Sequence, residues 1–147
     1  MKAQSDIVVS SHHMGHRGEI LDFQIEIAHT AIDAGADVVM AHAEHYPLGI
    51  EIYKGKPIFY GLGSFCFVKS NKRFLKGWVG LLARVSYAGG KVEKIAFSLV
   101  RQNDNTEVEI RPAAAEPAAI AEIQQMSKRF KTRLQPAGDE VIVTAEA

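Results

Sequence analysis

Two short apolar runs on either side of an amphipathic segment constrain the fold of this chain more than any other feature. Asp6–Ser11 is rich in β-branched residues and predicts a buried strand, and Ala36–Ala41 predicts a second one. Between them, Glu19–Ala34 carries apolar residues at three- and four-residue steps, which predicts a helix that Gly35 caps. The apolar positions of this helix are Ile20, Phe23, Ile27, Ala31 and Ala34. A strand, a helix and a strand with short connections predict a parallel βαβ unit.

Two β-hairpins are predicted after the βαβ unit. Gly49–Tyr53 and Pro57–Leu62 are extended runs around a Lys-Gly-Lys turn. Trp78–Ala88 and Lys91–Arg101 alternate in polarity and are joined by a Gly-Gly dipeptide, which tolerates the positive φ of a two-residue turn. The fold class is therefore α/β, a βαβ unit followed by β-hairpins.

The C-terminal part predicts one helix and one short strand. Pro117–Leu134 places apolar residues along one face of a helix, while Asn103–Pro117 is polar and Ala-rich. The residues of the helix face are Ile120, Ile123, Met126 or Ser127, Phe130 and Leu134. Glu140–Thr144 predicts a last edge strand.

Composition narrows the class of protein. The 147 residues are 47% hydrophobic, which suits one globular domain over residues 1–147. The 17 basic residues (Lys and Arg together) equal the 17 acidic residues (Asp and Glu together) in number, so we expect no nucleic-acid partner. We interpret the basic cluster Lys69–Lys76 as a solvated loop. No apolar run is long enough for a membrane segment or signal peptide, which leaves the localisation open. The apolar neighbours of Cys66 predict a buried thiol.

Histidine clustering is the most specific chemical signal. Five of the six histidines fall in two predicted loops, His12, His13 and His16 after the first strand and His42 and His45 after the second. The carboxyl ends of parallel strands share one sheet edge, where ligand sites collect, and imidazole is a common metal ligand. These loops therefore predict a metal site. The alternative is that the rings cap backbone groups and hydrogen-bond one another.

Other side chains are weaker candidates for a functional role. We interpret His29, inside the predicted helix, as a packing residue. Glu19 and Glu44 lie close enough in sequence to the histidines to bind a metal or orient a ligand, although a helix N-terminus explains Glu19 as well. Cys66 has no neighbouring cation or helix start that would lower its pKa, which disfavours a nucleophilic role.

Several segments resemble one known family in order and spacing. They are DIVVSSHHMG (Asp6–Gly15), IDAGADVV (Ile32–Val39), AHAEH (Ala41–His45) and GIEIYKGKPIFYGLG (Gly49–Gly63). This pattern is similar to that of the CapA family of poly-γ-glutamate capsule-synthesis proteins, which resemble calcineurin-like metallophosphoesterases. Met126–Leu134 is similar to a stretch near the family's C-terminal end.

The resemblance implies a fold, a site and a role. The fold would be the C-terminal half of a four-layered metallophosphoesterase sandwich. His13 matches the histidine of the family's H-W-G motif, and His42 and His45 match those of G-H-x-P-H, as catalytic metal ligands. They would bind divalent Mn, Zn or Fe, with two ions in a complete site acting on a phosphoester or polymer substrate. The family suggests a role in the cell envelope.

The chain departs from the family pattern in three respects. Ala41 and Glu44 replace the glycine and proline of G-H-x-P-H, and Ser64 stands where the family has asparagine. The family's upstream Asp and Asn-His motifs, which supply the bridging carboxylate, are absent, so we expect metal binding by this chain alone to be weak or absent. The missing half would also leave the edge of the Asp6–Ser11 strand exposed, which favours self-association or a partner chain.

Three functional hypotheses follow. The first is a capsule-biosynthesis protein with a metal-dependent phosphoesterase-type hydrolase fold, incomplete for catalysis alone. The second is a non-catalytic α/β binding or assembly module of a cell-envelope polymer system. The third is a mononuclear zinc hydrolase that uses His13, His42 and His45 with Glu44 as general base.

Overall fold

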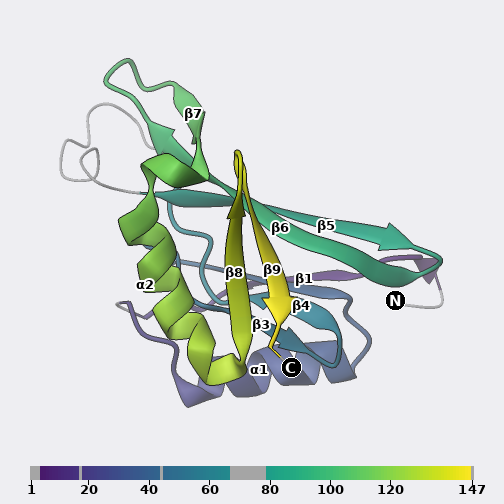
Figure 1. The fold of residues 1–147 in the computed structure, drawn as a ribbon. Helices are drawn as coiled ribbons and strands as arrows, with labels where there is room; N and C mark the ends of the chain where they lie inside the picture. The colour runs from purple at the N-terminus through teal and green to yellow at the C-terminus, as the bar shows by residue number, and fades with distance from the viewer. Residues whose placement is uncertain (1–3, 17, 44, 67–78, 147) are drawn as a thin grey trace.

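The computed structural model describes residues 4–16, 18–43, 45–66 and 79–146 and shows a mixed α/β fold (Figure 1). The fold class predicted from the sequence is therefore confirmed. The helices and strands, in chain order, are β1 (Val9–His13), α1 (Asp22–Asp33), β2 (Val38–His42), β3 (Ile50–Tyr53), β4 (Lys56–Phe59), β5 (Gly80–Ala88), β6 (Lys91–Gln102), β7 (Val108–Arg111), η3 (Ala113–Ala115), α2 (Pro117–Ser127), η4 (Lys128–Phe130), β8 (Thr132–Ala137) and β9 (Glu140–Ala145).

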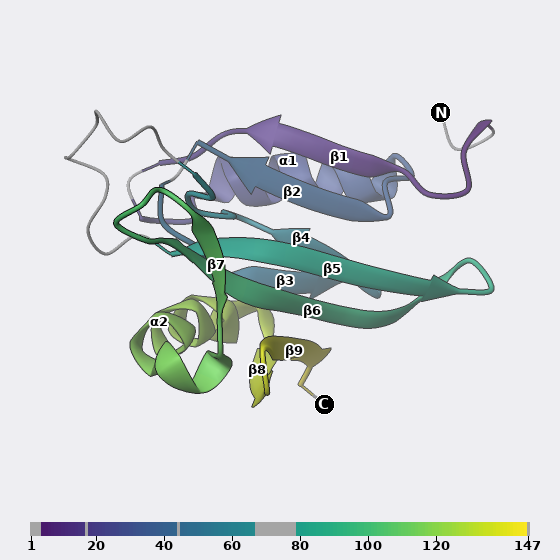
Figure 2. The same ribbon diagram turned by 90° about the horizontal axis from the view of Figure 1, so that it is seen from above.

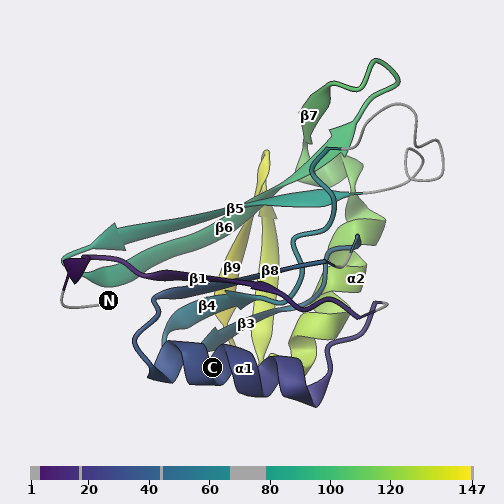
Figure 3. The same ribbon diagram turned by 180° about the vertical axis from the view of Figure 1, so that it is seen from behind.

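The first sheet has the strand order β1-β2-β4-β3. β1 and β2 are parallel, so the predicted βαβ unit is confirmed, and β3 and β4 form the predicted antiparallel hairpin. β4 is parallel to β2 and lies between β2 and β3. This order leaves β1 at an edge of the sheet, as expected. Helix α1 covers one face of the sheet (Figure 3).

The second sheet is antiparallel, with the order β5-β6-β9-β8 and β7 paired to β6. The predicted hairpin of β5 and β6 is confirmed, and its turn residues Gly89 and Gly90 have φ values of 56° and 74°. This positive φ is the conformation that glycine adopts without steric cost. The second sheet lies against the face of the first sheet that α1 leaves open, which gives a layered arrangement (Figure 2).

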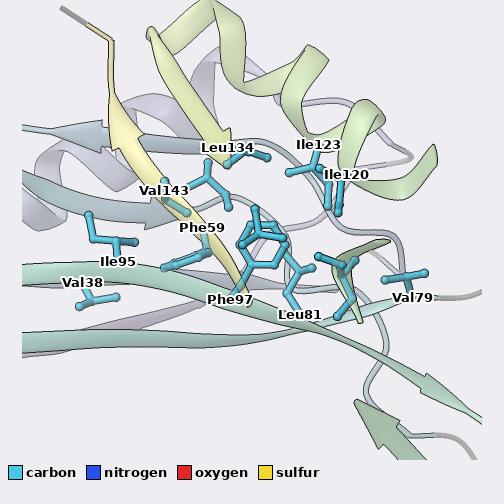
Figure 4. Packing of buried hydrophobic residues seen from close by; sticks show 14 residues of the cluster. Val38, Phe59, Val79, Leu81, Ile95, Phe97, Ile120, Ile123, Leu134 and Val143 are labelled. Atoms are coloured by element: carbon cyan, nitrogen blue, oxygen red, sulfur yellow. The ribbon is translucent and has the colours of Figure 1, made fainter. Parts of the chain in front are cut away.

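The main core lies between the two sheets and α2 (Figure 4). Phe59 of the first sheet and Phe97 of the second are fully buried there, together with Ile123 of α2. A second cluster on the other face packs Ala28 and Ile32 of α1 against the sheet. β2 contributes to both clusters, Val38 to the first and Val39 to the second. Burial on both faces explains why its sequence is a continuous apolar run rather than an alternating one.

The predicted apolar face of α1 is wrong in part. The helix begins at Asp22 rather than Glu19, and its buried residues are Gln24, Ala28 and Ile32. Phe23 and Ile27 are 47% and 39% exposed. The buried face is offset by one residue because Gln24 satisfies both ends of its amide inside the protein, which makes its burial possible.

The predicted C-terminal helix and last strand are both present, but the end of the helix and the position of the strand were predicted wrongly. The helix α2 ends at Ser127, and Leu134 belongs to strand β8, because Lys131 adopts a left-handed conformation (φ 52°) that stops helical continuation. β9 lies between β6 and β8, so it is an inner strand and not an edge. β7 was not predicted, since its residues alternate between charged and apolar over only four positions.

Cys66 is exposed, which contradicts the predicted buried thiol. Its sulfur lies 3.8 Å from Gln102 Nε2, and the adjacent Phe65 is itself exposed. The basic cluster Lys69–Lys76 and residue Glu44 lie outside the described residues. Within the described ranges, no helix is long and apolar enough to cross a membrane.

Candidate functional site

His13 and His42 are the last residues of two neighbouring parallel strands. They are direct register partners, and strands in a sheet lie about 4.8 Å apart. Side chains two residues apart point to the same face, and Met40 packs into the core between the two sheets. His42, and with it His13, therefore points to the face that carries the second sheet. Both side chains are exposed at the carboxyl edge of the sheet, where β1 and β2 end side by side (Figure 2).

The segment after β1 is anchored to the start of α1. The Met14 amide donates to the His42 carbonyl oxygen at 3.2 Å, which extends the pairing one residue past His13. The fully buried Gln24 side chain donates to the Met14 carbonyl oxygen and accepts from the Leu21 amide at 2.7 Å. Gln24 thus fixes the backbone beside His13. Gln24 was not predicted from the sequence, and a polar side chain in the buried register of a helix is the signal that identifies it.

His45 lies on the loop after β2 and contacts the segment after β4. Its Nδ1 is 3.2 Å from Ser64 Oγ, and the same hydroxyl donates to the His45 carbonyl oxygen at 3.4 Å. The Leu62 amide donates to the Ala41 carbonyl oxygen at 3.2 Å, which holds the two segments together. The substitution of asparagine by Ser64 therefore keeps a polar partner for His45.

Ala43, between His42 and His45, has a φ of 86°. A residue with a side chain pays roughly 1–2 kcal/mol in the left-handed region, which glycine does not. The loop that separates the two histidines is therefore strained at a position where this chain carries alanine. Glu44, the next residue, lies outside the described ranges.

The remaining predicted residues do not join His13 and His42. The His12 ring accepts or donates a hydrogen bond at 2.8 Å with Ser10, two residues before it on the same strand. Alternation along β1 places both on the opposite face from His13. The His16 carbonyl oxygen accepts from the Glu19 amide at 3.0 Å, and both side chains are exposed.

The predicted metal site stays a prediction. In the stretches of chain that the structure describes, no three His, Cys, Asp or Glu residues are grouped so as to hold a metal ion. His13 and His42 lie together, and His45 is engaged by Ser64 on the neighbouring loop. Two imidazoles are half of a tetrahedral ligand set, so other ligands have to come from elsewhere.

His29 has a structural partner rather than a place in the candidate site. Its Nε2 lies 3.0 Å from both carboxylate oxygens of Glu51, and its ring stacks on Tyr53 with centroids 3.7 Å apart. The buried Tyr60 hydroxyl donates to Glu51 at 2.6 Å. Burial, and then the Glu51 carboxylate, raise the pKa of Tyr60. Glu51, Tyr53 and Tyr60 belong to the segment Gly49–Gly63, so part of that pattern serves the fold.

Two ion pairs join the same segment to the residues around the end of α1. Lys54 Nζ lies 2.6 Å from Asp33, and the pair lowers the pKa of that carboxyl and raises the pKa of the Lys54 ammonium. Lys56 Nζ lies 3.2 Å from the buried Asp37, whose other oxygen accepts from the Val8 amide at 2.9 Å. Asp37 thereby fastens β1 to β2 at the end away from the histidines.

Comparison with known proteins finds one family model that matches part of the chain. Residues 1–69 match the family model described as bacterial capsule synthesis protein PGA_cap. The matched residues include α1 and all four strands of the first sheet, and the second sheet lies beyond them.

Named relatives agree with this match. The chain is 41% identical over 68 residues to the PGA biosynthesis protein CapA of Bacillus subtilis. The aligned residues make up 45% of this chain and 18% of that protein. It is 44% identical over 64 residues to a probable polyglutamine synthesis accessory protein of Mycobacterium tuberculosis, covering 42% of this chain and 17% of the relative. The capsule biosynthesis protein CapA of Bacillus anthracis is 35% identical over 68 residues, covering 45% and 16%. The chain thus matches less than a fifth of the length of these relatives.

Proposed function

Because residues 1–69 match the model of the bacterial capsule synthesis protein family PGA_cap, we propose that this chain acts in the synthesis of an anionic capsule polymer of the poly-γ-glutamate type. The names of the relatives from Bacillus support a role in capsule formation. A place at the cell envelope is part of the same proposal.

The finer proposal is that the carboxyl edge of the first sheet is part of a metal-dependent, phosphoesterase-type hydrolytic site. The observation that carries it is the register pairing of His13 with His42, which aims two imidazoles from adjacent parallel strands to one face. A bound divalent ion would polarise a phosphoryl oxygen and supply hydroxide near neutral pH. His13 and His42 would hold such an ion, and His45, held by Ser64, would border the site.

The missing ligands are proposed to come from another polypeptide segment that lies beside β1. β1 is an edge strand, so a segment added there would reach the position next to His13. The chain alone would then hold an ion weakly, since metal affinity depends on a complete ligand set.

A genetic experiment tests the proposed role. Deletion of the gene in its native host is expected to lower the amount of surface polymer, and the wild-type chain, restored at its own locus, is expected to recover it. A His13→Ala/His42→Ala variant is expected to fail, while His12→Ala, whose ring lies on the other face of β1, is expected to succeed. Unchanged polymer after deletion would contradict a role in capsule synthesis.

A second candidate is a non-catalytic binding or assembly module of the same polymer system. Two observations favour it: the described residues contain no three-residue metal cluster, and the strained Ala43 separates His42 from His45. Under this alternative the His13→Ala/His42→Ala variant would restore the polymer as well as the wild type does. A mononuclear zinc site with Glu44 as base would instead show one ion per chain and depend on Glu44.

A further inference from the structure

A hollow lies between two hairpin turns at the end of the first sheet away from the histidines. The turn between β3 and β4 contributes Lys54, Gly55 and Lys56, and the turn between β5 and β6 contributes Gly90 and Lys91. Asp37, Tyr87 and Val92 complete the lining, and the volume is about 350 Å³. We name this feature the basic hollow.

Three lysines line the basic hollow, and the ammonium groups of two of them are held in place. Lys56 Nζ donates to the Ala36 carbonyl oxygen at 2.7 Å and lies 3.2 Å from Asp37. Lys54 Nζ lies 2.6 Å from Asp33 and 4.9 Å from the centre of the Tyr53 ring. These contacts fix the positions of both charges, which lowers the entropy that a ligand has to pay on binding.

Lys91 supplies the charge that the carboxylates do not balance. It is exposed on the rim, and no ion pair joins it to another of the described residues. Lys54 pairs with Asp33, outside the hollow, and Lys56 pairs with Asp37 in its lining, so these two pairs and Lys91 together carry an excess of one positive charge in a chain whose formal net charge is zero. The Tyr87 hydroxyl, which donates to the Asp37 carbonyl oxygen at 3.4 Å, adds a neutral polar group to the wall.

From this arrangement we propose that the basic hollow binds carboxylates of an anionic polymer chain. The proposal rests on the proposed function, which supplies the polymer, and it adds a binding site distinct from the histidine edge. Lysine ammonium groups act as point charges that donate to a carboxylate from several directions, which suits a flexible ligand.

The distance between the two sites favours a polymer over a single small ligand. Asp37 precedes β2 and His42 ends it, so the five residue steps between them span roughly 17 Å at about 3.3 Å per residue. A single amino acid cannot touch both positions. A polymer with one carboxylate per unit can engage the hollow repeatedly, and rebinding of neighbouring units raises the apparent affinity.

Binding of labelled poly-γ-glutamate to the purified chain, followed by fluorescence anisotropy, tests the proposal. The wild-type chain is expected to bind, and the affinity is expected to fall as salt screens the charges. Lys91→Glu is expected to weaken binding about tenfold or more, since reversal replaces an attraction by a repulsion. Lys128→Glu is the matched control, because Lys128 is exposed beyond the end of α2 and away from the hollow, and it is expected to change the affinity less than about twofold.

Three outcomes would overturn the proposal that the basic hollow binds an anionic polymer. They are no binding by the wild-type chain, equal weakening by Lys91→Glu and Lys128→Glu, and equal binding of the neutral polymer dextran. Each leaves the genetic test of the proposed function unaffected, because that test measures surface polymer and not binding. A failed deletion test with intact, Lys91-dependent binding would instead overturn the role in capsule synthesis and keep the anion site.

Discussion

The Glu51 carboxylate accepts a hydrogen bond from the Tyr60 hydroxyl at 2.6 Å and lies 3.0 Å from His29 Nε2. Tyr60 is fully buried, and burial raises the pKa of its hydroxyl, so the proton stays on Tyr60 and is available to Glu51. The three residues come from β3, from the residue that follows β4 and from α1. This contact therefore ties the helix to the sheet whose carboxyl edge carries His13 and His42.

Replacing Tyr60 by Phe is expected to lower the free energy of unfolding by about 1–3 kcal/mol. The buried Glu51 would keep His29 but lose its hydrogen bond from the Tyr60 hydroxyl, and a buried hydrogen bond to a carboxylate contributes about that much. Tyr53→Phe is the matched control, because its hydroxyl makes a long, exposed contact of 3.4 Å with Asp33. Urea denaturation of both variants measures the difference, and equal stabilities would contradict the role of the Tyr60–Glu51 contact.

Replacing Ala43 by Gly is expected to stabilise the chain by about 0.5–1 kcal/mol. The left-handed conformation of Ala43 costs more than glycine loses in conformational entropy on folding. Ala34→Gly, at a cap residue with a φ of −76°, is expected to destabilise by a similar amount. A loss of thermal stability in both variants would show that Ala43 is not strained.

Replacing Glu116 by Gln is expected to change the acid sensitivity of the fold. Glu116 accepts two hydrogen bonds from Arg101, at 2.5 and 2.7 Å, and this contact lowers the pKa of the carboxyl despite its burial. A lowered folded-state pKa contributes stability above the unfolded value of about 4.5 and loses it as the pH falls through the folded value. The wild-type chain should therefore lose stability below about pH 4.5 more steeply than Glu116→Gln, as measured by denaturation across pH. Parallel pH profiles would contradict this contribution.

The exposed edge of β1 is expected to pair with another strand, from a second copy or a partner chain. Val9 is 53% exposed on this edge, and Phe23 and Ile27 of α1 are exposed as well. An uncharged edge beside apolar surface favours association, and a lysine on an edge opposes it. Light scattering after size exclusion should show association by the wild-type chain and less by Val9→Lys. Ile110→Lys, on the exposed face of β7, is the control. A monomeric wild-type chain would count against the prediction.

The sequence predicted the first sheet better than the rest of the fold. The strands around α1 and both hairpins were recognised because apolar runs, turn glycines and a capping glycine mark them locally. The register of α1 was not predicted, because the burial of Gln24 depends on hydrogen bonds to Met14 and Leu21 that form only in the folded chain. Strand β8 was read as helix, because its apolar residue Leu134 continues the spacing of α2 past a left-handed Lys131.

In the candidate site, too, some contacts could be predicted from the sequence and others could not. The proximity of His13 and His42 follows from the parallel arrangement of two strands, which a sequence pattern can reveal. The contact of His45 with Ser64 joins residues 19 apart in different loops, and no local pattern specifies it. The same holds for His29, whose partner Glu51 lies on a strand 22 residues away.

The central claim is that His13 and His42 form the core of a metal site at the carboxyl edge of the first sheet. Calorimetric titration of the chelator-stripped chain with Zn²⁺ and Mn²⁺ tests it most directly, with His13→Ala/His42→Ala as the test variant and His12→Ala as the control. The account predicts weak Zn²⁺ binding that persists in His12→Ala and disappears in the double variant, since imidazole is a preferred zinc ligand. Identical isotherms for the wild-type chain and the double variant would contradict it.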